Sequence, residues 1–374
     1  MGEDFFQYLP SEIIVDILSR LHTLDAMACK CVCKPWLVLL ATPEFVNSHI
    51  SRSVPGLAVE THAKTYNVIQ FVDEIDLNFD EQHRLNVDFY FELPFDEPMH
   101  SSANGLIFLC GDDHDDLILC NPITNDYIKL PCPRQTSPKD LIYVETFGFG
   151  VSRMTGQYKV VRIFGGTSLQ KEYKNECQVY TVGTGSWRKV PPDSSLWLYE
   201  TVGGVFLNGN LYWTVEKATN GSGRWISCFD LETEVYSSFP TPPYFYPDVL
   251  FGKTLCVLRD CLCVSDLSDD GTGSIVIWLM NEDDQCFVKE LIIIPGFGYY
   301  FDHYLHVWPI RVFENGDAFV EADGDLFYYS NTSGTFDGDL FYYYNKSKTY
   351  TLTTMYASSF LSLKSFVMEN VSSF

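Results

Sequence analysis

The feature that most constrains this chain is a repeated unit of short strands that begins near residue 53. Runs of Val, Ile, Phe and Tyr alternate with Gly, Asn and Asp, which is the pattern of antiparallel strands joined by tight turns. Copies of the unit are recognisable at 105–131, 147–191, 203–240 and 253–295, followed by a last copy that holds the near-duplicates GDLFYYSN (324–331) and GDLFYYYN (338–345). The period drifts around roughly 50 residues, which is typical of propeller blades.

The repeat predicts an all-β domain in which the copies stack around an axis. One four-stranded meander cannot bury both of its faces, so blades pack against one another until the ring closes. If 55–97 is counted as a first, degenerate blade, the sequence predicts about six blades. The closing strand is expected from the last apolar stretch, Phe360, Leu361, Leu363, Phe366 and Val367. A two-sheet β-sandwich is the alternative.

The first 52 residues have a different pattern, which predicts four short helices. Apolar residues recur at helical spacing from Ile13 to Leu21, and a second helix is expected to begin at Asp25 as its N-cap. Pro35 and Thr42-Pro43 predict the starts of the third and fourth helices. We therefore expect a small all-α domain at 5–52 and a β-domain at 53–374. So small a bundle has too little core, and part of its apolar surface should face another element or another protein.

Composition limits the partners that the chain can have. The 374 residues carry a formal net charge of −24, which disfavours nucleic-acid binding and favours a basic protein partner. No apolar run is long enough to span a bilayer, and the start lacks the pattern of a secretory signal. We expect no membrane association and a cytoplasmic location, with the nucleus as a second option. The twelve cysteines include no C-x-x-C pair and are interpreted as reduced core residues.

Motifs for catalysis and cofactors are weak throughout. The segment 247–254 ends like a phosphate loop but starts with proline, and His303 and His306 have no third ligand at metal-binding spacing. The acidic cluster 112–116 reads as a solvated turn, and there is no G-x-S-x-G elbow. We expect no cofactor, no metal site and no catalysis by this chain.

Several of these segments resemble a known family. LPSEIIVDILSRL (9–21), CVCKPWLVLL (31–40) and FVNSHI (45–50) resemble the F-box of plant F-box proteins. The repeats resemble the kelch-like, F-box-associated β-domain of the same proteins, including the S-locus F-box group, through the following segments: NPITNDYIKLP (121–131), FGFGVSRMTGQYKVVRI (147–163), VYTVGTGSWRKVP (179–191), VFLNGNLYWTV (205–215), CFDLETE (228–234) and IVIWLM (275–280). The resemblance covers nearly the whole chain and rests on the order and combination of the segments.

The resemblance implies a non-catalytic substrate receptor of an SCF-type ubiquitin ligase. Its F-box would bind a Skp-family adaptor and, through it, the cullin and RING subunits. Carried over by position, the adaptor contacts would be Leu9, Pro10, Ile13, Ile17, Leu18, Leu21, Val32, Lys34, Trp36 and Leu39. The chain departs from the family pattern at His22, Ala26 and Ala28, where proline, leucine and a basic residue are usual. These departures predict a weaker interface with the adaptor.

The β-domain would then hold a protein target for ubiquitylation. Residues 73–97 contain nine acidic residues and one arginine, so we hypothesise an acidic face that steers a basic target. Candidate aromatic anchors for the target are Trp197, Tyr199, Tyr244, Phe245 and Tyr246. A stylar ribonuclease, as in self-incompatibility, and an immune or signalling protein are both open as targets. The alternative function is a carbohydrate-binding or glycosidase-like propeller with a helical cap, which requires two carboxyl groups about 5–10 Å apart.

Overall fold

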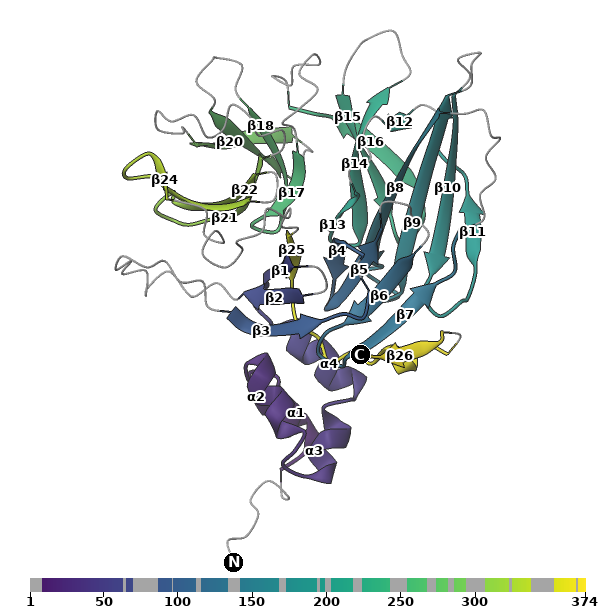
Figure 1. Ribbon diagram of the computed structural model, residues 1–374, viewed down its shortest axis with the longest axis vertical. Coiled ribbons are helices and arrows are strands. Elements are labelled where there is room, and N and C mark those ends of the chain that lie inside the picture. Colours follow the sequence, from purple (N-terminus) through teal and green to yellow (C-terminus); the bar gives the residue numbers. More distant parts are fainter. Residues whose placement is uncertain are drawn as a thin grey trace, which may run out of the picture.

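The computed structural model describes residues 9–62, 65–69, 87–95, 97–111, 116–133, 142–167, 173–193, 196–198, 203–217, 224–242, 254–267, 274–281, 286–293, 307–322, 325–337, 353–367 and 369–374. Four helices come first: α1 (Ser11–Leu18), α2 (Thr23–Cys29), α3 (Lys34–Leu39) and α4 (Pro43–Ile50). They form a bundle at one end of the molecule, and the strands follow as a group of sheets (Figure 1).

Local capping chemistry explains the start of α4, whereas the start of α2 differs from expectation. Thr42 is the N-cap of α4, because its Oγ1 accepts a hydrogen bond from the backbone N–H of Phe45 at 3.3 Å, and Pro43 follows at the first helical position. The prediction that Asp25 caps the second helix was wrong, since α2 begins two residues earlier, after His22. Asp25 instead lies in the first turn, where a carboxylate is favourable to the helix dipole.

The described strands form six antiparallel sheets, each a blade of a propeller, as the repeat predicted (Figure 1). Blade 1 contains β25 (Thr353–Tyr356), β1 (Gly56–His62), β2 (Thr65–Ile69) and β3 (Val87–Glu92). Blade 2 contains β4 (Met99–Ala103), β5 (Leu106–Cys110), β6 (Leu117–Asn121), β7 (Asp126–Leu130) and β26 (Val371–Ser373). Blade 3 contains β8 (Ile142–Val151), β9 (Tyr158–Thr167), β10 (Tyr173–Thr181) and β11 (Trp187–Val190).

The other three blades continue the same meander. Blade 4 contains β12 (Leu196–Leu198), β13 (Val205–Leu207), β14 (Asn210–Lys217), β15 (Arg224–Asp230) and β16 (Tyr236–Pro240). Blade 5 contains β17 (Thr254–Leu258), β18 (Cys261–Leu267), β19 (Ile275–Asn281) and β20 (Cys286–Ile293). Blade 6 contains β21 (Val307–Val312), β22 (Ala318–Ala322), β23 (Asp325–Ser330) and β24 (Thr335–Asp337).

The ring is closed by a different segment from the one expected. Strand β25 pairs with β1, with Gly56 opposite Tyr356, so blade 1 combines the start of the β-domain with a strand from near its end. The apolar stretch from Phe360 to Val367 is not a strand and contains a short 3₁₀ helix, η3 (Leu363–Ser365). It fills the junction between the helices and blade 2, where Phe360 and Leu363 are buried in different clusters.

Apolar side chains between the blades form the core. One cluster joins blades 2 and 3 around Phe108, Phe149 and Val160, and another joins blades 3 and 4 around Trp213. The glycines at 148 and 204 form a bridge here and lie directly against the Trp213 indole. A Cβ at Gly204 would lie 2.5 Å from carbon atoms of this ring, so the close approach of β8 and β13 requires a residue without a side chain.

The cysteines are only partly core residues. All twelve have free thiols. Cys110, Cys120, Cys177 and Cys263 are buried as predicted, whereas Cys31, Cys33, Cys132 and Cys286 are exposed. Within the described part of the chain, no helix has the length and apolar character that a membrane crossing needs.

Candidate functional site

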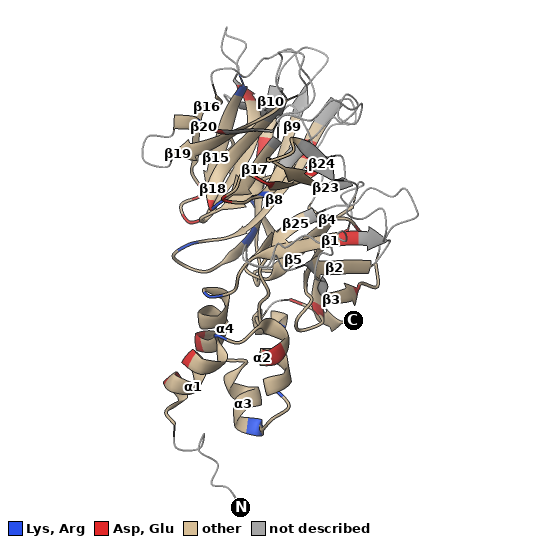
Figure 2. Ribbon diagram, turned by 90° about the vertical axis from the view of Figure 1, so that its left-hand side faces the viewer, with Lys and Arg blue, Asp and Glu red and all other residues tan. Residues whose placement is uncertain are grey.

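The helical bundle presents apolar side chains to solvent on α1, α2 and α3. Ile13 and Ile17 lie one turn apart on α1, which places them on the same side of that helix. Further exposed apolar side chains on or beside these helices are Leu24, Val32, Leu37 and Val38, of which Val38 is 68% exposed. Figure 2 shows acidic positions on α1 and α2 and a basic position on α3, so the exposed apolar residues share these helices with charged ones. We call these six residues the exposed apolar face.

The same bundle buries its other apolar residues against the propeller. Leu18, Leu40 and Phe45 are buried in one cluster with Ile123, from the turn between β6 and β7, and with Phe360. Helix α4 is the helix nearest to the strands, and α3 lies at the far end of the bundle (Figure 1). Because the propeller covers the α4 side, the exposed apolar face remains open in this structure.

The structure divides the predicted adaptor residues into three groups. Those with exposed side chains are Pro10, Ile13, Ile17, Val32 and Lys34. Those that are half-buried are Leu9, Leu21, Trp36 and Leu39. Leu18 is 2% exposed and belongs to the core between helices and propeller, so in this arrangement a partner cannot reach it.

Three residues of the exposed apolar face were not among the adaptor contacts predicted from the sequence. Leu24 lies in the first turn of α2, and Leu37 and Val38 are adjacent on α3. A signal for the last two was present in the run Trp36–Leu40. Five consecutive apolar residues circle a helix, so they cannot all face one core.

The departures from the family pattern also have a structural placement. Ala26 is fully buried in the helical core, so the missing leucine side chain changes the packing of the bundle and leaves the exposed apolar face unchanged. His22 is the exposed N-cap residue of α2, and Ala28 is an exposed position on the same helix.

A small polar network holds α1 in place beside the end of α4. Arg52 Nη2 lies 2.6 Å from Asp16 Oδ1, and Arg20 contacts the other oxygen of the same carboxylate at 3.1 Å. Hydrogen bonds from Arg20 and Arg52 lower the pKa of Asp16. Ser48 donates a hydrogen bond to Ser19 at 3.0 Å. These contacts link α1 to α4 and so fix the direction of the side that carries Ile13 and Ile17.

The predicted target anchors are largely outside the described residues. Tyr199, Tyr244, Phe245 and Tyr246 lie there, as does most of the acidic segment 73–97. Trp197 is in β12, whose backbone pairs with Val215–Lys217 at the end of β14. This strand lies at the end of the propeller away from the helices (Figure 1). Any target held by β12 would therefore sit opposite the exposed apolar face.

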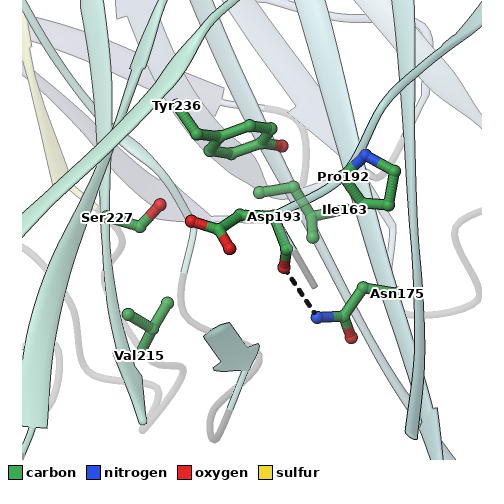
Figure 3. Close-up of a pocket in the computed structure, with 7 residues that line it drawn as sticks. All are labelled: Ile163, Asn175, Pro192, Asp193, Val215, Ser227 and Tyr236. Carbon is green, nitrogen blue, oxygen red and sulfur yellow. Dashed lines mark hydrogen bonds between the residues drawn. The ribbon is translucent and has the colours of Figure 1, made fainter. Parts of the chain in front are cut away.

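A cavity between blades 3 and 4 brings together polar groups that sequence reasoning did not name. The space is small, about 20 Å³, and is lined by Ile163, Asn175, Pro192, Asp193, Val215, Ser227 and Tyr236 (Figure 3). Asn175 Nδ2 donates a hydrogen bond to the backbone oxygen of Asp193 at 3.3 Å. The cavity holds one carboxylate, so it does not supply the pair that glycoside hydrolysis needs. Among the residues described here, no three His, Cys, Asp or Glu side chains are grouped to hold a metal ion.

Comparison with known families identifies both parts of the chain. Residues 6–49 match the F-box-like family, and residues 57–292 match the F-box associated beta propeller domain. The second match alone covers more than half of the chain. The chain belongs to the F-box associated β-propeller family. The exposed apolar face thus lies within the F-box of a plant F-box protein, and an F-box implies binding to a Skp-family adaptor in an SCF complex.

Several proteins of Arabidopsis thaliana are similar to this F-box protein. An F-box/kelch-repeat protein is 29% identical over 296 residues, which is 74% of this chain and 77% of the relative. Another F-box protein is 24% identical over 375 residues, covering 88% of this chain and 82% of the relative. Among solved structures, the SapL1 lectin in complex with alpha methyl fucoside aligns with 76% of this chain and 95% of the lectin. Its TM-score of 0.37 and 8% identity are too low to support a functional comparison.

Proposed function

We propose that this F-box protein is the substrate-recognition subunit of an SCF-type ubiquitin ligase. The helices α1–α3 bind a Skp-family adaptor, which connects to the cullin and RING subunits, and the propeller binds the protein to be ubiquitylated. The observation that carries the proposal is the exposed apolar face of the F-box, left open while the α4 side is buried against the propeller.

The energetics of such an interface favour a protein partner. Side chains such as Ile17 and Val38 expose apolar area that water solvates poorly, and covering a Val, Leu or Ile side chain completely contributes about 1.5–3 kcal/mol. A few such residues near the centre of an interface dominate its affinity. The charged Lys34 at the start of α3 would lie among or beside them and would contribute less if it stays solvated.

The receptor needs no catalytic group of its own. By holding adaptor and target at opposite ends, the chain raises the effective concentration of target lysines near the ubiquitin-bearing enzyme. The family is that of adaptor-type substrate receptors, which agrees with this division of labour.

We further propose that the target is basic. The segment 1–54 has six acidic and four basic side chains, so most of the −24 charge belongs to the β-domain. Long-range attraction of this kind speeds association and weakens with salt. A stylar ribonuclease or a basic signalling protein would fit, and the charge does not favour one over the other. The proposal requires that target binding weaken clearly between low salt and half-molar salt.

Titration calorimetry of the full chain with a purified plant Skp-family adaptor tests the proposed function. Ile17→Glu and Val38→Glu each place a charge in the apolar interface and should weaken binding by at least about tenfold. The matched control is Val235→Glu, because Val235 is 61% exposed on the turn between β15 and β16, outside the helical domain. Unchanged affinity in both F-box variants, or equal loss in the control, contradicts the proposal.

A further inference from the structure

The residues after β25 run across the boundary between the F-box and the propeller. We call residues 357–374 the C-terminal strap. Phe360 is the strap residue that enters the helical core, where it is 2% exposed. Its ring meets the ring of Phe45 edge-on, with centroids 5.4 Å apart, and that of His49 at 5.0 Å. The Lys30 ammonium lies 4.6 Å from the centre of the same ring. Phe360 therefore contacts residues of both α4 and the end of α2.

A single buried amide of the propeller holds the strap on both sides of Phe360. Asn121 Nδ2 donates hydrogen bonds to the backbone oxygens of Ser359, at 3.0 Å, and Leu361, at 2.7 Å. Asn121 Oδ1 accepts a hydrogen bond from the backbone N–H of Ile123 at 2.9 Å. Ile123 packs in the same helical cluster as Phe360, so Asn121 positions both of these residues against the F-box.

The rest of the strap is fixed to blades 2 and 3. Leu363 is fully buried in the core between these blades. The carboxylate of Glu369 accepts hydrogen bonds from the Tyr180 hydroxyl and the Gly183 backbone N–H, both at 2.7 Å. Strand β26 adds itself to the edge of blade 2 by pairing with β7. The strap is thus a part of the propeller, and Phe360 is its projection into the F-box.

We propose that Phe360 is a positioning residue that fixes the direction of the exposed apolar face relative to the propeller. With the phenyl ring wedged between α4 and Lys30, the helices cannot turn on the short connection after α4 without opening a buried cluster. The fixed orientation of the F-box on the propeller is a claim about this chain alone. Its consequence, that a bound target is held at a fixed place relative to the rest of a ligase, rests on the proposed function. A fixed orientation matters because the effective concentration of target lysines near the ubiquitin-bearing enzyme depends on the length and stiffness of the connection between them.

The test is single-molecule energy transfer in the full chain, with dyes on unnatural residues at two exposed positions, Ala28 on α2 and Met154 on blade 3. The native strap should give one narrow distance distribution. Phe360→Ala should broaden or shift it, and Phe360→Leu should restore most of it. The control is Phe366→Ala, which also removes a phenyl ring from the strap. Because Phe366 packs on Tyr158 in blade 3 and not on the helices, this variant should leave the distribution narrow.

A second variant separates positioning from folding of the F-box. Asn121→Ala removes the hydrogen bonds that hold the strap on both sides of Phe360 and leaves every helical side chain in place, so it should broaden the distribution while adaptor affinity stays within about twofold. Narrow, native distributions in both Phe360→Ala and Asn121→Ala overturn the proposal. Adaptor affinity is measured separately on the same proteins, so loss of the proposed adaptor binding in the native chain would contradict the ligase function and leave the orientation result standing.

Discussion

Truncation to alanine should have different effects at two neighbouring residues of α1: at Leu18 it should lower the stability of the free chain, and at Ile17 it should mainly lower the affinity for the adaptor. Ile17 is 41% exposed and Leu18 is 2% exposed. Leu18→Ala leaves a cavity where the helices meet the propeller and should cost about 2–5 kcal/mol of stability, enough to unfold or loosen a bundle of four short helices. Ile17→Ala removes a side chain that is only partly buried, so its cost in the free chain should be clearly smaller, about 1 kcal/mol.

The effect of Ile17→Ala should appear on adaptor binding instead. Fully burying an isoleucine contributes about 1.5–3 kcal/mol, and two-fifths of the residue is still exposed, which leaves about 0.6–1.2 kcal/mol for the interface, or roughly a three- to sevenfold loss of affinity. Urea unfolding followed by helical circular dichroism gives the stabilities, and calorimetry with the adaptor gives the affinities. The reasoning is refuted if Ile17→Ala destabilises the free chain as much as Leu18→Ala does.

Two further predictions concern the propeller. Gly204→Ala should lower stability by about 1–3 kcal/mol in urea unfolding, because the added methyl group overlaps the Trp213 ring, and a fully stable variant would show that β13 can move aside. Burial acts to raise the pKa of Glu234, but hydrogen bonds from Arg188 and Lys159 outweigh it and hold the pKa below the usual value of a glutamate. A carboxyl group whose pKa is lower in the folded chain than in the unfolded chain stabilises the fold at a pH above its unfolded pKa, and this stabilisation is lost as the pH falls through its folded pKa. Glu234→Gln should therefore be less stable than the native chain at pH 7, and the difference in stability should shrink as the pH falls below about 4. A stability gap independent of pH would contradict this assignment.

The repeat made most of the fold predictable from the sequence. Strand-forming runs with Asn and Gly at the turns define the blades, and left-handed Asn104, Asn125 and Asn208 confirm that turn chemistry. The end of the chain was not predictable in the same way. The apolar stretch with Phe360 and Leu363 predicts burial but not secondary structure. It forms an irregular strap and not a strand where Asn121 binds the backbone oxygens of Ser359 and Leu361, and the sequence does not reveal such long-range contacts.

The candidate site was predicted in outline and refined by burial. The spacing from Ile13 to Leu21 indicates an apolar side, yet it cannot say which members the propeller covers, because that depends on how α4 and Phe360 pack. Leu18 is therefore a core residue in the structure, whereas Leu24, Leu37 and Val38 belong to the exposed apolar face. The anchors proposed for the target remain predictions, and only the backbone of Trp197 lies among the described residues.

Hydrogen–deuterium exchange of the full chain, with and without the purified Skp-family adaptor, tests the central claim most directly. The account predicts slower amide exchange in α1, α2 and α3, where the exposed apolar face lies, and unchanged exchange in the turn around Val235. Binding that slows exchange in the propeller strands and leaves these three helices unaffected would contradict it.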